Sequence, residues 1–185
     1  MPSDKDRLYV ALYARGGAPT MPGLEDTYHW ALIVGPKTED KRSRGARFHA
    51  REKMRLIGTG AVPESVWEYE ELESTMLPTS MLLVRVMIGK VKDRNRLESL
   101  LRNIPIRPRV EGWNCVAWVK EAIETALRDK KVLGTSKNLD WDSIRDTAMW
   151  YVGQKKAAHR FDGQGEFDRE KAATWDMIDG FERVP

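Results

Sequence analysis

Hydrophobic and polar positions in the first half of the chain alternate or form short apolar runs, a pattern typical of β-strands. The run 81–91 is the most apolar, so we expect a central strand there. Residues 56–62, which include two glycines, fit neither a strand nor a helix clearly. The segments that we predict to be strands are 8–13, 28–35, 47–51, 65–69 and 81–91.

The second half shows apolar residues spaced by three and four positions, which indicates amphipathic helices. Asp93 and Asn114 are good N-cap residues, and each precedes such a pattern. Further helices are expected at 140–154 and at 172–178. Because the strands come first and the helices afterwards, we predict an α+β fold with packed helices on an antiparallel sheet.

A chain of 185 residues is long enough for one domain with a sizeable core. We expect a single catalytic-type domain over 1–185, with its core at about 8–156 and a C-terminal extension at 157–185. No apolar run approaches the length of a membrane span, and the charged start lacks the apolar segment of a signal peptide. A single cysteine cannot form an internal disulfide. We therefore expect a soluble, cytoplasmic protein.

Charge and ligand spacing argue against two classes of function. The chain has 31 basic and 28 acidic residues, and no basic face with interleaved aromatic residues stands out, so we expect no nucleic acid partner. One cysteine and three scattered histidines give no spacing of metal ligands. We expect no metal and no cofactor.

Cys115, the only cysteine, follows Asn114 and opens the helix that Asn114 is predicted to cap. The positive end of a helix dipole favours a thiolate, so we expect a lowered pKa for Cys115. This pattern predicts a nucleophile. The alternative is that Cys115 is a small buried hydrophobic residue, as most free cysteines are.

A nucleophilic thiol needs a base, and His29 and His49 lie in two predicted strands. If 28–35 and 47–51 pair as a hairpin, alternation places both imidazoles on the same face. The third histidine, His159, fits a surface turn. For His29 and His49, the alternative is a structural role beside the core.

The run His29-Trp30-Ala31-Leu32-Ile33-Val34-Gly35 resembles the histidine strand of lecithin retinol acyltransferase-like proteins, which include small phospholipases and acyltransferases. Phe48-His49-Ala50 and Asn114-Cys115 match the second histidine and the Asn-Cys pair of that family in order and approximate spacing. The similarity spans about residues 8–128. Permuted deSUMOylating isopeptidases also place a histidine strand before an Asn-Cys helix, and both groups are similar to papain-like thiol enzymes with permuted elements. The chain also resembles uncharacterised fungal proteins with HWALIVGPK and WNC-x-WV signatures.

The resemblance implies a permuted papain-like architecture with the nucleophile at a helix N-terminus. It implies that Cys115 attacks the substrate, that His29 takes the thiol proton, and that His49 orients or charges His29. Such a division of roles agrees with the need of a base for a third group that fixes its tautomer. After Asn-Cys, however, this chain has Val-Ala-Trp-Val, where the acyltransferases usually have Glu-His-Phe-Val.

Residues next to the nucleophile and the base are the candidates for substrate binding. The amide of Cys115 would stabilise an oxyanion, and Tyr28 is a candidate second donor, although strand alternation points it away from His29. Trp30 and Trp113 would line a substrate pocket, beside Asn114.

These observations predict a cysteine-dependent hydrolase or acyltransferase that acts on an ester, thioester or amide through an acyl-thiol intermediate. Its partner would be a small-molecule acyl or amide substrate, or a peptide. One alternative is a cysteine peptidase or isopeptidase with the same site. The other is a non-catalytic binding or accessory protein on the same scaffold, with a buried and ordinary thiol.

Overall fold

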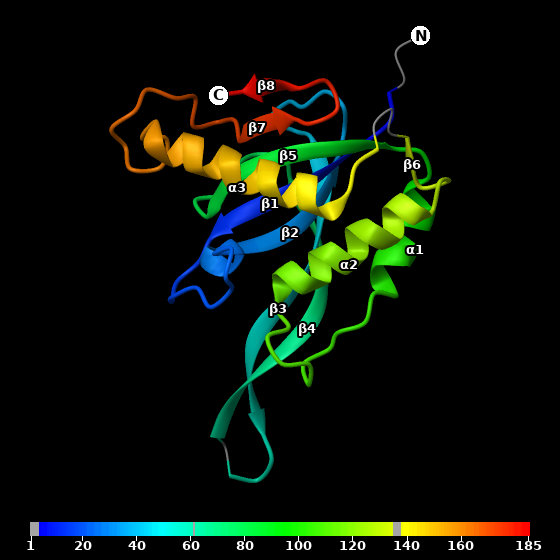
Figure 1. Ribbon diagram of the computed structural model, residues 1–185, viewed down its shortest axis with the longest axis vertical. Helices are drawn as coiled ribbons and strands as arrows, with labels where there is room; N and C mark the ends of the chain where they lie inside the picture. The colour runs from blue at the N-terminus through cyan, green and yellow to red at the C-terminus, as the bar shows by residue number, and fades with distance from the viewer. Residues whose placement is uncertain (1–3, 61, 135–137) are drawn as a thin grey trace.

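A mixed sheet forms the centre of the computed structural model, which describes residues 4–60, 62–134 and 138–185 (Figure 1). The strand order is β4-β3-β2-β1-β5-β7-β8, and β6 pairs with β5. The sheet contains β1 (Arg7–Ala14), β2 (Tyr28–Gly35), β3 (Arg44–Ile57), β4 (Val62–Thr75), β5 (Leu82–Val91), β6 (Leu133–Gly134), β7 (Ala173–Asp176) and β8 (Phe181–Val184). A short 3-10 helix, η1 (Glu25–Thr27), precedes β2.

Three helices pack against one face of this sheet (Figure 1). They are α1 (Arg94–Arg102), α2 (Cys115–Arg128) and α3 (Trp141–Ala157). Their apolar stripes meet alternate residues of the central strands, such as Val10, Leu32 and Phe48, in one buried core. The coarse prediction of an α+β fold is therefore confirmed.

The other face of the sheet carries a smaller apolar cluster that includes Tyr9, Tyr13 and Ile33. His29 and His49 share this face, because they alternate with Trp30 and Phe48 of the helix-side core. Cys115 belongs to the helix-side core, so the thiol and the two imidazoles lie on different faces of the sheet.

The predicted strand bounds hold best where both faces of a strand are buried. The segments 8–13, 28–35 and 81–91 correspond to β1, β2 and β5. The segments 47–51 and 65–69 are only the inner parts of β3 and β4, which run to Ile57 and from Val62 as one long hairpin. Helices begin after Asp93 and Asn114, as predicted.

The prediction of a helix at 172–178 is wrong. Ala173–Asp176 form β7, which pairs parallel to β5, so the sheet is not purely antiparallel. The apolar spacing at 172–178 arises because Ala173 joins the helix-side core while Ile178 joins the opposite cluster. The segment 157–185 therefore extends the sheet through β7 and β8. Within the described residues, no helix is both long and apolar enough to span a bilayer.

The buried carboxylate of Asp176 holds the turn between β7 and β8, because it accepts the amides of Ile178 and Asp179 and pairs with Arg183. We predict that Asp176→Ala lowers the free energy of unfolding by about 3 kcal/mol, since it leaves these donors unsatisfied. Urea denaturation measures this change. The exposed neighbour Asp179 is the control, and Asp179→Ala should change stability by about 0.5 kcal/mol or less. Equal effects of the two variants would contradict this role of Asp176.

Candidate active site

The two predicted histidines meet directly across β2 and β3. His29 Nε2 lies 2.6 Å from His49 Nδ1, and the ring planes are inclined at 72°. The backbones of β2 and β3 pair only from Leu32–Val34 to Ala46–Phe48, so this side-chain bond joins the strands where their ladder has ended. The prediction that both imidazoles share a face is confirmed.

A third member of this chain, Glu70, was not found by sequence reasoning. The register of β3 and β4 places His49 directly opposite Glu70, and His49 Nε2 lies 3.0 Å from Glu70 Oε1. Arg51 binds the other carboxylate oxygen at 2.7 Å, and an Arg47 nitrogen lies 3.8 Å from Oε1. Glu70, His49 and His29 therefore form one continuous chain of hydrogen bonds.

The charge state of Glu70 determines the direction of these bonds. Burial raises the pKa of Glu70, but the hydrogen bond from His49 and the charge of Arg51 outweigh this effect and leave the pKa lowered. An ionised carboxylate only accepts hydrogen bonds, so His49 Nε2 must donate. Neutral His49 then accepts at Nδ1, and His29 donates from Nε2. The lone pair of neutral His29 is thereby assigned to Nδ1.

Both imidazoles are neutral at physiological pH. Burial lowers the pKa of His29 to about 3, and the neighbouring His49 and Arg47 act in the same direction. Burial also lowers the pKa of His49, although Glu70 opposes this shift. A neutral imidazole with a defined free nitrogen can accept a proton, but a pKa of about 3 makes His29 a weak base in this structure.

Cys115 is the first residue of α2, as predicted. The side chain of Asn114 caps the helix by accepting the amides of Val116 and Ala117, at 3.0 and 3.2 Å. The Trp118 amide donates to the Asn114 carbonyl. These bonds occupy the amides of Val116, Ala117 and Trp118 and leave the amide of Cys115 available. This amide could therefore donate a hydrogen bond to an oxyanion. Asn114 acts as a helix cap in this arrangement.

The Cys115 thiol belongs to the helix-side core and is 1% exposed. The backbone of Trp30, the residue after His29, acts on this thiol, and the charge of Arg15 acts on both Cys115 and His29. These effects place the thiol near the start of β2. Among the described residues, however, no hydrogen bond joins Cys115 to either imidazole. The structure thus brings the two histidines together and leaves the thiol close to their strand but not bonded to them.

The expected lowering of the Cys115 pKa is wrong. Burial raises the pKa of Cys115, and it outweighs the opposing effects of the Trp30 backbone, Arg15 and the first-turn amides of α2. Cys115 is therefore a neutral thiol here. The helix N-terminus favours the thiolate, but it does not compensate for the loss of water around the sulfur.

The segment 15–24 lies against the start of α2. Met21 lies against the helix cap, with its Sδ 3.3 Å from Asn114 Nδ2, and it packs on the helix-side core. The carboxylate of Asp26 holds this segment by accepting the amides of Thr20 and Met21 and the hydroxyl of Thr20. Gly17 has a φ of 89°, which a residue with a side chain rarely adopts.

The aromatic candidates occupy different positions. Trp30 is fully buried, donates from Nε1 to the Glu25 carbonyl and stacks near Trp141, so it belongs to the core rather than lining an open pocket. Trp113 is half-buried and meets Trp67 of β4 edge to face.

Tyr28 lines a cavity of about 310 Å³ together with Arg15, on the helix side of β2. Its position opposite to His29 follows the predicted alternation.

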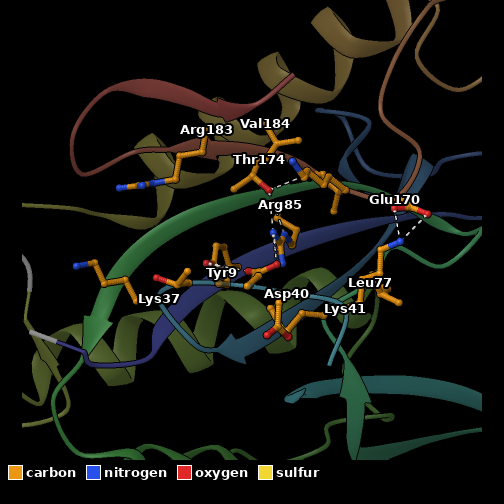
Figure 2. Close-up of a pocket in the computed structure, with 15 residues that line it drawn as sticks. Tyr9, Lys37, Asp40, Lys41, Leu77, Arg85, Glu170, Thr174, Arg183 and Val184 are labelled. Atoms are coloured by element: carbon orange, nitrogen blue, oxygen red, sulfur yellow. Dashed lines mark hydrogen bonds and ion pairs between the residues drawn. The ribbon is translucent and has the colours of Figure 1, made fainter. Parts of the chain in front are cut away.

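A larger cavity of about 360 Å³ lies on the other face of the sheet, lined by residues of β1, β5 and β7 that include Tyr9, Arg85 and Thr174 (Figure 2). Arg85 lies at its centre, bound to Glu39 at 3.0 Å and to Thr174 at 3.1 Å. Tyr9 stacks against this guanidinium, 4.7 Å from its ring centre. Among the described residues that line it there is no histidine or cysteine, so this cavity provides no thiol nucleophile. The ion pair of Arg85 with Glu39 holds the loop that contains Glu39 against the sheet.

Comparison with known proteins assigns a family but no activity. Residues 5–184 match the family of unknown function (DUF6914). No curated protein and no solved structure matches the chain.

The lowered pKa of His29 predicts a pH dependence of stability. A histidine whose folded pKa is about 3 stabilises the fold above its unfolded pKa near 6.5, and this contribution is lost as the pH falls between these values. We expect the free energy of unfolding of the native chain to fall by about 1 to 2 kcal/mol more than that of His29→Gln between pH 7 and pH 5. Urea titrations at both pH values test this, and parallel losses would contradict it.

The packing of Met21 predicts that segment 15–24 limits access to Cys115. We expect Met21→Ala to accelerate alkylation of Cys115 by iodoacetamide roughly three- to tenfold at pH 8. The smaller side chain makes fewer apolar contacts with the core, so displacement of segment 15–24 costs less free energy. Met81, which is exposed elsewhere, provides the matched control Met81→Ala. If both variants react like the native chain, another element covers the thiol.

Proposed function

Since the chain belongs to a family of unknown function (DUF6914), we propose its activity from the site itself. We propose a cysteine-dependent hydrolase or acyltransferase that acts on an ester, thioester or amide through an acyl-thiol intermediate. Cys115 is the nucleophile, His29 is the base, and His49 and Glu70 are positioning residues. The observation that carries this proposal is the chain Glu70–His49–His29, which leaves His29 Nδ1 unprotonated.

The thiol lies beside the strand that carries the proposed base, but on the helix side of the sheet. The proposed proton transfer therefore requires the His29 side chain to reach Cys115 around the start of β2. Cys115 opens α2 beside the Trp30 backbone, one residue from His29, and it carries the available first-turn amide. A small displacement of segment 15–24 would hydrate the sulfur and lower the desolvation that raises its pKa. The resemblance to lecithin retinol acyltransferase-like enzymes, with a permuted papain-like architecture, agrees with these roles.

The proposed reaction begins with a neutral pair. As Cys115 Sγ attacks the acyl carbon, its proton passes to His29 Nδ1, and the carbonyl oxygen becomes an oxyanion near the Cys115 amide. The carbonyl re-forms and expels the alcohol, thiol or amine, which takes the proton from His29. Water or another acceptor then loses a proton to His29 and attacks the thioester. Release of Cys115 as a thiol restores the starting state.

His49 and Glu70 act on this reaction through His29. When His29 becomes cationic, it still donates from Nε2 to His49, whose Nε2 donates to Glu70. The carboxylate thus stabilises positive charge along the chain without taking a proton. Arg51 holds the second carboxylate oxygen of Glu70 and keeps this group ionised.

The burial of Cys115 favours a second candidate function, a non-catalytic binding or accessory protein. A thiol that is 1% exposed and unbonded to an imidazole has the properties of an ordinary core cysteine. In that case the polar chain from Glu70 to His29 only joins β3 and β4 to β2. The peptidase and isopeptidase alternatives use the same proton transfers and stay predictions.

An activated ester separates the two candidates. We expect p-nitrophenyl acetate to acetylate Cys115, with the product located by peptide mass spectrometry. His29→Gln should slow acylation by about 100-fold or more, because the general base is lost. Glu70→Gln should slow it about tenfold and change its pH profile, because an amide both donates and accepts and no longer fixes the tautomer of His49.

The matched control lies in the same strand. Glu73 of β4 is exposed and outside the histidine chain, and Glu73→Gln should acylate at the native rate. Acylation that proceeds equally in His29→Gln, or is absent from native protein and from Met21→Ala alike, would contradict the enzyme proposal and favour the binding function.

A further inference from the structure

The hairpin of β3 and β4 extends well beyond the rest of the sheet (Figure 1). The pairing of β3 with β2 ends at Phe48, whereas its pairing with β4 continues to Ile57. The residues from His49 to Ile57 therefore form a ribbon of two strands, roughly 27 Å long. Such a ribbon has little core of its own, so its outer residues do not need to be apolar.

The end of this ribbon is nevertheless apolar and exposed. Leu56 is 69% exposed, Val62 is 61% exposed and Ile57 is 47% exposed. Met54, just before them, is 63% exposed. The sequence from Leu56 to Pro63 contains no charged residue. A cluster of this kind at a projecting end indicates an interaction site.

Apolar residues lie on both faces of the ribbon at the same level. Ile57 pairs with Val62 on one face, and Leu56 pairs with Pro63 on the other. A groove on a protein partner would cover mainly one face and leave the other in water. An apolar medium that surrounds the tip covers both faces, so this distribution favours the interface of a lipid bilayer.

A neutral belt of charged residues follows the apolar tip. Three basic and three acidic side chains lie along the ribbon from residue 51 to residue 68, so the belt has no net charge. Glu68 pairs with Lys53 at 3.3 Å and with Arg55 at 2.5 Å. A belt without net charge is compatible with zwitterionic headgroups and gives no preference for an anionic surface.

We infer that the β3–β4 tip docks into a zwitterionic phospholipid surface. The insertion is shallow, because the outer edges of a two-stranded ribbon present unpaired backbone groups that hydrocarbon does not satisfy. Leu56, Ile57 and Val62 enter the interfacial region, and the charged belt stays at the headgroups. This inference depends on the tip alone and not on the proposed chemistry of Cys115.

Flotation of the full chain with phosphatidylcholine vesicles tests the inference. The tip variant is Leu56→Thr/Ile57→Thr/Val62→Thr, in which threonine is well suited to strands. The control is Leu72→Thr/Met81→Thr/Phe181→Thr, which removes three exposed apolar side chains outside the tip. We expect the native chain and the control to float, and the tip variant to bind at least about tenfold less. High salt should leave the native binding nearly unchanged.

A probe at the tip gives an independent measurement. An environment-sensitive fluorophore on Thr59→Cys, in the Cys115→Ser background, should shift to the blue with these vesicles, while the same label on Lys130→Cys should not. Binding of Cys115→Ser also separates docking from catalysis. No flotation of the native chain, or equal flotation of both triple variants, would overturn the inference. So would a dimer in solution that the tip substitutions dissociate, because a second copy would then cover the tip.

Discussion

The ionised carboxylate of Glu70 fixes which nitrogen of His49 bears a proton, and through His49 it fixes the tautomer of His29. Two consequences follow from this one constraint. The strands β2 and β3 are joined beyond their backbone ladder, and the free lone pair is at His29 Nδ1. Burial, against the charge of Glu70, keeps both histidines neutral. The fold supplies the register that makes this possible, because β3 and β4 place His49 and Glu70 directly opposite each other.

The same packing that positions Cys115 also keeps its thiol protonated. The apolar stripe of α2 places the first turn of the helix against β2, and the thiol enters the core there. Burial then raises its pKa more than the helix N-terminus lowers it. Access and ionisation are therefore coupled, since opening of segment 15–24 would change both at once. This coupling explains how one cysteine can serve a stable core and remain a candidate nucleophile.

Sequence reasoning succeeded where burial imposes a clear pattern. The bounds of β2 and the start of α2 follow from an apolar run closed by Gly35 and from the Asn114 cap. It failed for β7, whose apolar residues serve two faces of the sheet and imitate a helical spacing. It also shortened β3 and β4, because cross-strand ion pairs rather than alternating apolar residues hold their outer parts.

Glu70 was missed for a related reason. Its role depends on the register of the hairpin, and the sequence from Glu52 to Ser65 has no regular alternation of apolar and polar residues that would reveal that register. One signal was present: a turn centred between Thr59 and Gly60 pairs His49 with Glu70. The tautomers of the two histidines test the account most directly, by ¹⁵N NMR of the imidazoles at neutral pH. The account predicts protonated Nε2 and unprotonated Nδ1 in both His29 and His49. A proton on His29 Nδ1 would contradict it, because that nitrogen could not accept the thiol proton.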